Sequence, residues 1–267
     1  MNIVLLASLV LGGIGLVFGS TLAFAGKKFA VEIDPRLSEI LKVLPGTNCG
    51  ACGYPGCEGL AQAIIEGKAK STGCVAGGEK VAKEVAKVLG LEEEITITKN
   101  IAFLNCQGGK EIAVNRFIYK GIKTCRASHL TQGGEKGCPN GCIGYGDCVM
   151  VCPFSAIYMG EDGLPKVDST KCTGCGLCVK ECPRGILTLL PINIPLLLGC
   201  KTILPGPDAR QVCSRACIGC GICTRVCPKG AITMQGRLPV INYELCDGCG
   251  ICVEKCPTKA LILLKTK

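Results

Sequence analysis

The stretch CIGCGICTRVCP, residues 217–228, holds four cysteines in the spacing C-x2-C-x2-C-x3-C and ends in proline. The same pattern recurs in CTGCGLCVKECP, residues 172–183, and in CDGCGICVEKCP, residues 246–257. The first three thiolates of such a run can bind three irons of one [4Fe–4S] cluster, while the fourth completes a neighbouring cluster. Glycines between the cysteines allow tight turns and expose backbone N–H groups to the cluster. The motif therefore predicts paired clusters in ferredoxin-like modules.

A fourth, looser copy is CPNGCIGYGDCVMVCP, residues 138–153, which keeps the final C-x3-C-P. Crossed ligation between paired motifs then predicts two clusters in each of two modules. The middle module is expected to use Cys138, Cys142, Cys148 and Cys182 for one cluster, and Cys172, Cys175, Cys178 and Cys152 for the other. The C-terminal module is expected to use Cys217, Cys220, Cys223 and Cys256, and Cys246, Cys249, Cys252 and Cys227. A short apolar run after each Cys-Pro predicts a strand.

A zinc site is the alternative interpretation of clustered cysteines. Zinc sites combine C-x2-C pairs across longer spacers and use four ligands per ion. That pattern does not account for a third cysteine and then a fourth followed by proline, repeated in tandem. The N-terminal group, Cys49, Cys52, Cys57 and Cys74, has the spacing C-x2-C-x4-C-x16-C, which admits either zinc or an iron–sulfur cluster.

The composition shows that something other than a large apolar core must hold this chain together. Its 267 residues include 24 cysteines and 37 glycines, with no tryptophan and one histidine. Chains of this kind depend on disulfides or on bound metal. The choice between them depends on the redox compartment.

An uncharged run from Asn2 to Ala25 predicts a membrane anchor. As a helix it would extend about 36 Å, against a hydrocarbon core of about 30 Å. Lys27 and Lys28 follow it and no basic residue precedes it, so the positive-inside rule puts the remainder in the cytoplasm, where thiols stay reduced. A cleaved signal peptide would need a basic start and a shorter apolar run. Gly15 and Gly19 make one helix face smooth enough for a partner helix.

The expected fold class is α+β. Helices are expected at 35–44, from near Cys57 to Ile64, and at 79–91, and strands in EITIT (94–98) and IAFLNC (101–106). The expected domains are an anchor (1–26), a four-cysteine iron–sulfur domain (27–90), a connector (91–135), a ferredoxin-like module (136–190), a second connector (191–212) and a second module (213–267).

Assigning the motif cysteines to five clusters leaves Cys106, Cys125, Cys200 and Cys213, two near each end of the middle module. Four thiols are the complement of one further [4Fe–4S] cluster. If the connectors lie side by side, a sixth cluster would bridge the two modules. The alternatives are four scattered, inert thiols, or substitution of Cys213 for a neighbouring ligand such as Cys217.

An N-terminal anchor, then CGACGYPGC at 49–57 with a later cysteine, then ferredoxin repeats resembles the B subunit of the Rnf complex, in its longer form with two ferredoxin-like pairs. The resemblance implies a membrane complex that oxidises reduced ferredoxin, reduces NAD and moves Na⁺ or H⁺ across the membrane. It implies that this chain takes electrons from ferredoxin and passes them to other subunits, with no bond chemistry of its own.

Several other functions find little support in the residues. No G-x-G-x-x-G follows an expected strand, so NAD and flavin are expected on other subunits. The single histidine, His129, is expected at the surface rather than on a metal. The formal net charge is +9, but five oxidised clusters at about −2 each would leave about −1, and six about −3. The basic residues therefore do not indicate nucleic acid binding.

Exposed basic residues near a cluster can dock an acidic ferredoxin. The candidates are Lys171, Lys180 and Arg184 in one module, and Arg215, Arg225 and Lys229 in the other. Two other functions remain open: a polyferredoxin wire of another anchored oxidoreductase, such as a hydrogenase or formate dehydrogenase, and a redox-sensing iron–sulfur module. The four-cysteine group beside the anchor favours an electron-transfer subunit of a membrane redox pump over both.

Overall fold

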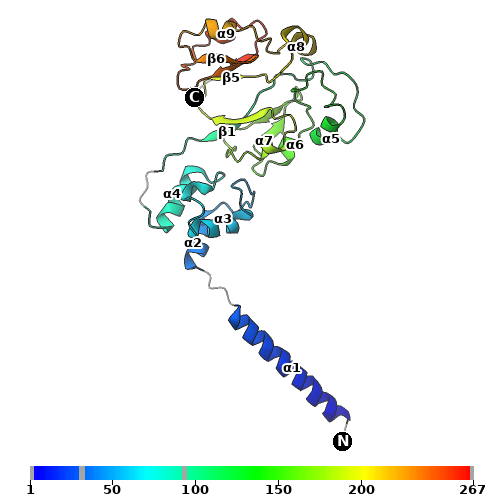
Figure 1. Cartoon of the computed structure of the whole chain (residues 1–267), viewed down its shortest axis with the longest axis vertical. Coiled ribbons are helices and arrows are strands. Elements are labelled where there is room, and N and C mark those ends of the chain that lie inside the picture. Colours follow the sequence, from blue (N-terminus) through cyan, green and yellow to red (C-terminus); the bar gives the residue numbers. More distant parts are fainter. Residues whose placement is uncertain (1–2, 30–33, 92–94, 265–267) are drawn as a thin grey trace.

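A computed structural model of the chain describes residues 3–29, 34–91 and 95–264. Along the sequence these ranges form an extended N-terminal helix, a small helical domain and a larger body that holds both ferredoxin-like modules (Figure 1). Parts of four expected segments lie outside the described residues: residues 1–2 of the anchor, residues 30–33 of the four-cysteine domain, residues 92–94 of the first connector and residues 265–267 of the second module.

The N-terminal helix α1 (Ile3–Lys28) points away from the rest of the chain (Figure 1). From Leu6 to Lys28 it is long and apolar enough to cross a membrane, judged by length and composition. The hydroxyl of Ser20 donates to the backbone oxygen of Leu16 at 2.6 Å. This internal hydrogen bond removes an unsatisfied polar group that a lipid environment would penalise.

A small helical domain follows, formed by α2 (Pro35–Val43), α3 (Gly56–Ile65), a 3₁₀ turn η1 (Ser71–Gly73) and α4 (Gly78–Val88). Asp34 caps α2 by accepting from the backbone N–H of Arg36 at 2.9 Å. Ile40, Leu60 and Val85 are fully buried where the helices meet. The three expected helices are therefore present.

The middle module contains two antiparallel strand pairs. Strand β1 (Asn100–Leu104) pairs antiparallel with β4 (Leu187–Pro191), and β2 (Ile157–Met159) pairs antiparallel with β3 (Pro165–Val167). The short helices are α5 (Cys125–Leu130), α6 (Asp147–Met150) and α7 (Leu177–Glu181). The expected strand in IAFLNC is present as β1, whereas residues 95–98 form no strand.

The C-terminal module repeats this plan. Strand β5 (Leu196–Leu198) pairs with β8 (Leu261–Leu263), and β6 (Ile232–Gln235) pairs with β7 (Leu238–Ile241), all antiparallel. Its helices are α8 (Gly206–Val212), α9 (Ile222–Arg225) and α10 (Ile251–Glu254). The strands expected after each Cys-Pro are present as β2, β4, β6 and β8, and each module takes one further strand from the chain that precedes it.

The four cysteine motifs share one backbone feature. Helices α6, α7, α9 and α10 are each preceded by a glycine in the left-handed conformation: Gly146, Gly176, Gly221 and Gly250. Residues with a Cβ rarely adopt this conformation. The glycines therefore mark equivalent positions in all four motifs, including the looser one.

Asn105 ties the two modules together. Its side-chain amide donates to the backbone oxygen of Leu198 at 2.8 Å, and its side-chain oxygen accepts from the hydroxyl of Thr188 at 2.6 Å. Leu198 belongs to the C-terminal module and Thr188 to the middle one, and the Asn105 residue is only 7 % exposed. A buried polar bridge of this kind fixes how the modules sit against each other.

We predict that Asn105→Ala weakens this junction, because it leaves the Leu198 carbonyl without its donor. The loss should be about 1–3 kcal/mol of unfolding free energy, measured as a lower urea midpoint by circular dichroism of the holoprotein. Gln235→Ala at the exposed end of β6 is the matched control and should change stability by less than about 0.5 kcal/mol. Equal effects of both substitutions would show that Asn105 does not stabilise the junction between the modules.

Candidate metal centres

The N-terminal cysteines surround one cavity. Cys49, Cys52, Cys57 and Cys74 line it together with Leu60 at its base. Cys57 lies in the first turn of α3, where its backbone N–H donates to the side-chain oxygen of Asn48 at 2.8 Å. The amides at a helix N-terminus favour an anionic group. The four residues that the spacing groups together are thus brought to one place.

Three further cavities are each lined by four cysteines from two motifs. In the middle module, Cys152 of one motif joins Cys172, Cys175 and Cys178 of the other motif. In the C-terminal module, Cys256 and Cys227 likewise each line the cavity of the other motif. The sets are Cys172, Cys175, Cys178 and Cys152; Cys217, Cys220, Cys223 and Cys256; and Cys246, Cys249, Cys252 and Cys227. These sets match the crossed grouping expected from the spacing.

The remaining cavity of the middle module differs from the expected grouping. It is lined by Cys142, Cys148 and Cys182, as expected, but its fourth cysteine is Cys125 and not Cys138. The expected sharing of Cys125 with Cys106, Cys200 and Cys213 is therefore not what the structure shows. Cys125 comes from α5, on a segment that the sequence predicted to be a connector.

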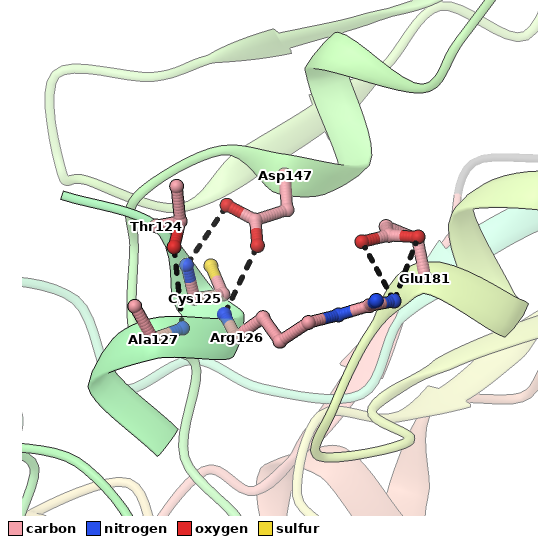
Figure 2. Close-up of polar contacts among 6 residues, drawn as sticks. All are labelled: Thr124, Cys125, Arg126, Ala127, Asp147 and Glu181. Carbon is pink, nitrogen blue, oxygen red and sulfur yellow. Dashed lines mark hydrogen bonds and ion pairs between the residues drawn. The ribbon is translucent and has the colours of Figure 1, made fainter. Parts of the chain in front are cut away.

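Hydrogen bonds hold Cys125 against this cavity (Figure 2). The backbone N–H groups of Cys125 and Arg126 donate to the Asp147 carboxylate at 2.8 and 3.0 Å, and Asp147 begins the helix that carries Cys148. The Arg126 guanidinium also pairs with Glu181 at 3.2 Å, next to Cys182. The start of α5 is thus fixed to α6, which carries Cys148, and to α7, which ends just before Cys182.

The looser motif shows why Cys125 is required there. When the motifs are aligned on their left-handed glycines, Gly146 corresponds to Gly176, and Tyr145 stands where the other motif has Cys175. Cys142 then takes the place of the first ligand. This motif therefore lacks a cysteine at its second position, and Cys125, from outside the motif, is the fourth cysteine that lines the cavity. This alignment on Gly146 is the sequence signal that could have identified Cys125.

The donor sets fit iron–sulfur clusters better than single ions. All 24 cysteines are free thiols. Among the described residues, no three His, Cys, Asp or Glu side chains lie close enough together to hold one metal ion. Zinc would draw its thiolates to about 2.3 Å from one centre, whereas a cubane is larger and holds its ligands farther apart. Backbone N–H groups also point at the sulfurs, as Ala156 does to Cys152 at 3.4 Å and Ala260 to Cys256 at 3.3 Å.

Burial raises the pKa of several of these thiols. It raises the pKa of Cys148 and of Cys178 to about 12, and neighbouring thiols add to the rise. Burial also raises the pKa of Cys74. Thiols of this kind lose their protons only when a cation replaces them, so cluster binding would release protons and stabilise the fold. A bound cluster would supply one-electron transfer, and the surrounding residues would exclude water and tune its potential.

The regions that hold these cavities match known protein families. A family described as "Putative Fe-S cluster" matches residues 44–76, and a family described as "4Fe-4S dicluster domain" matches residues 138–186 and 216–260. Over 80 % of the chain, it is 40 % identical to the B subunit of the ion-translocating oxidoreductase complex of Methanosarcina acetivorans, covering 81 % of that protein. This chain belongs to the B-subunit family of ion-translocating oxidoreductase (Rnf) complexes.

Two further relatives support this assignment. The chain is 46 % identical over 80 % of its length to the B subunit of the Na(+)-translocating ferredoxin:NAD(+) oxidoreductase complex of Acetobacterium woodii, covering 64 % of that protein. It is 39 % identical over 80 % of its length to the B subunit of the proton-translocating ferredoxin:NAD(+) oxidoreductase complex of Clostridium ljungdahlii, covering 75 % of that protein. As a member of the Rnf B family, the chain is an iron–sulfur electron-transfer component of an ion-translocating oxidoreductase complex.

The basic residues expected to dock ferredoxin fall into two groups. Lys171, Lys180, Arg215, Arg225 and Lys229 are exposed. Arg184 is not, and its expected role at a docking surface is wrong. It is 9 % exposed, and its guanidinium donates to the backbone oxygens of Cys138, Gly141 and Gly133. His129 is half-buried rather than fully at the surface, and its Nδ1 has no hydrogen-bond partner among the described residues.

We predict that Cys125→Ala removes about four irons from the holoprotein, because Cys125 completes the cavity with Cys142, Cys148 and Cys182. The measurement is iron and acid-labile sulfide per chain after anaerobic purification. Arg126→Met, on the next residue of α5, is the matched control; it loses only an exposed ion pair worth up to about 1 kcal/mol and should keep all its iron. Full iron in the Cys125 variant would remove this residue from the ligand set.

Proposed function

We propose that this chain accepts electrons from reduced ferredoxin and passes them through its [4Fe–4S] clusters to the membrane subunits of a ferredoxin:NAD oxidoreductase that translocates ions. The observation that carries the proposal is the order of the cysteine cavities from an exposed C-terminal module to the domain beside α1. The names of the relatives from Acetobacterium woodii and Clostridium ljungdahlii support ferredoxin and NAD as the redox partners. Neighbouring subunits would hold the NAD and flavin.

Charge on a thiol of one cavity acts on a thiol of the next, and we infer that electrons pass between the clusters that these cavities would hold. Burial raises the pKa of Cys252, and charge on Cys223, a thiol of the other cavity of the C-terminal module, adds to the rise. In the middle module, Cys178 is influenced by Cys148 in the same way. The thiols on either side of each step belong to different predicted clusters.

The middle module also adjoins the N-terminal domain. Charge on Cys49 acts on the thiol of Cys175. The N-terminal cavity is therefore next to one cavity of the middle module, although more than 100 residues separate these cysteines in the sequence. The helical domain is the first to follow α1 (Figure 1), so its cluster would be the one to deliver electrons to membrane partners.

The C-terminal module offers the entry point. Cys220 and Cys249 are the two cysteines classed as exposed, and they lie in different cavities of this module. Lys229 lines the cavity of Cys249, and the Arg225 guanidinium donates to the backbone oxygen of Cys220 at 3.4 Å. Exposed ligands shorten the distance to a docked donor, and these two cations would attract an acidic ferredoxin.

A polyferredoxin wire of another anchored oxidoreductase would use the same cluster chemistry. Membership of the Rnf B family favours the ion-translocating complex over that alternative and over a redox sensor. Purification of the chain with its membrane neighbours separates the three. Flavin-bearing partners are expected, whereas a nickel or molybdenum subunit would indicate the other oxidoreductases, and isolation as a lone regulator would indicate a sensor.

We predict that the double substitution Arg225→Glu and Lys229→Glu slows reduction of the holoprotein by ferredoxin at least tenfold at low salt. Charge reversal replaces electrostatic attraction by repulsion, and the difference should shrink as salt screens it. Anaerobic stopped-flow absorbance gives the rate. The matched control is Lys171→Glu with Lys180→Glu in the middle module, which should change the rate little. A larger effect in this control would move the docking site to the middle module.

We predict that the body of the protein faces the cytoplasm, because Lys27 and Lys28 follow the apolar helix and positive residues are retained on that side. A reporter fused after Lys267 should be active only as a cytoplasmic reporter, and the chain should remain uncleaved in the membrane fraction. Replacing both lysines with glutamine is the control and should weaken the orientation. Export of the wild-type fusion, or cleavage near Ala25, would overturn the topology.

A further inference from the structure

Once Cys125 is placed with the middle module, four cysteines line none of the five cavities described above. They are Cys106, Cys138, Cys200 and Cys213. Three are buried and Cys106 is half-buried. They come from the segment after β1, the loop before α6, the segment after β5 and the end of α8, and thus from both modules.

The backbone brings Cys106, Cys138 and Cys213 together. A Cβ added to Gly108 would lie 3.5 Å from the sulfur of Cys106 and 3.6 Å from that of Cys213, so both sulfurs border the same space. Cys213 forms an isolated antiparallel bridge with Ala113. The next residue, Val114, accepts from the N–H of Gly137 at 2.8 Å, which places Cys138 beside this bridge.

Cys200 reaches the same region from the C-terminal module. It packs in one buried cluster with Cys213 and Ala113. Cys213 therefore adjoins both Cys106 and Cys200. Burial raises the pKa of Cys200 and of Cys213 to about 11, and charge on Cys138 adds to the rise in both thiols.

Two of these sulfurs already accept backbone hydrogen bonds of the kind found at the other cavities. The sulfur of Cys106 accepts from the N–H groups of Gly108 and Cys142, both at 3.3 Å. The sulfur of Cys200 accepts from Thr202 at 3.5 Å and from Cys217 at 3.2 Å. Such N–H groups tune a cluster's reduction potential.

Two buried cations flank this site without a carboxylate. Lys136 is 7 % exposed, and its ammonium has one hydrogen bond among the described residues, to the backbone oxygen of Gly109 at 3.5 Å. Arg184 contacts backbone oxygens, and its Nε has no partner there. Neither forms an ion pair within the described part of the chain. Buried charges normally have a counter-ion, and an oxidised four-thiolate cluster would carry about −2.

We propose that Cys106, Cys138, Cys200 and Cys213 hold a sixth [4Fe–4S] cluster at the junction of the two modules, with Lys136 and Arg184 as its buried counter-charges. The proposal rests on the proposed electron-transfer function and extends it. It differs from the sequence expectation by one exchange. Cys138 is a ligand of the cluster at the junction, and Cys125 is a ligand of a cluster in the middle module.

This cluster would close the one gap in the series of cavities. On one side, Cys106 accepts a hydrogen bond from Cys142, which lines a cavity of the middle module. On the other side, Cys200 accepts one from Cys217, which lines a cavity of the C-terminal module. An electron entering the C-terminal module would thus reach the middle module through the junction.

Iron counts in paired variants test the ligand set. Cys106→Ala, Cys138→Ala and the double variant should each lose about four irons, because both residues serve one cluster. Cys106→Ala with Cys125→Ala should lose about eight, because these residues serve different clusters. Iron, acid-labile sulfide and the electron paramagnetic resonance spectrum of the reduced holoprotein are measured together, and unchanged spectra of the remaining clusters show that the fold persists.

Other results would overturn either the ligand set or the proposed function, and the measurements distinguish the two. A loss of about four irons when Cys106 and Cys125 are both replaced, and about eight when Cys106 and Cys138 are, would restore the original grouping. Full iron in Cys106→Ala would mean an inert thiol and five clusters, leaving the proposed electron transfer from ferredoxin intact. Failure of ferredoxin to reduce a protein with the expected iron pattern would instead reject the proposed function and leave the sixth cluster in place.

Lys136→Met provides an independent readout. The variant should keep its iron, but one cluster should show a lower midpoint potential in a redox titration, because the added electron loses a nearby positive charge. The exposed Lys120→Met is the matched control and should shift no potential. If no midpoint potential changes in Lys136→Met, Lys136 is not a counter-charge of the cluster.

Discussion

A [4Fe–4S] cluster needs four thiolates in one place, and here separate short loops must supply them together. This requirement explains the small apolar core. The strands are three to five residues long, and the buried side chains Ile186 and Leu187 come directly after the Cys182-Pro183 turn that delivers a ligand. Apolar packing on this scale positions the loops but contributes little stability by itself. Cluster binding and folding are therefore coupled in this chain.

The same requirement explains how the two modules are joined. Each module takes a strand from the segment that precedes it, and Asn105 hydrogen bonds across both. The residues next to that bridge include Cys106, and the strand that receives its hydrogen bond leads to Cys200. The contacts that fix the modules therefore also bring their thiols together. Lys136 and Arg184 place positive charge at the same junction, where the proposed cluster would otherwise be costly to bury.

The sequence predicted those features that depend on local pattern. The strands after each Cys-Pro, the three helices of the four-cysteine domain and the crossed sets in three module cavities all follow from short motifs. Partners distant in sequence were not predictable in this way. Pairing of β1 with β4 depends on tertiary register, and residues 95–98 have strand-like composition but form no strand. Arg184 follows a Cys-Pro and was expected at the surface. The fold buries it instead, and its guanidinium donates to three backbone oxygens. The sequence grouping put Cys125 with Cys106, Cys200 and Cys213, although Tyr145 at the second position of the looser motif signals a missing thiol there.

The central claim is a continuous series of six clusters from the C-terminal module to the domain beside the membrane helix. Iron and acid-labile sulfide per chain in the wild-type holoprotein, purified without oxygen, test it most directly. Six clusters predict roughly 24 iron and 24 sulfide per chain with no zinc. About 20 of each would break the series at the junction, and stoichiometric zinc with about 16 iron would remove the N-terminal cluster as well.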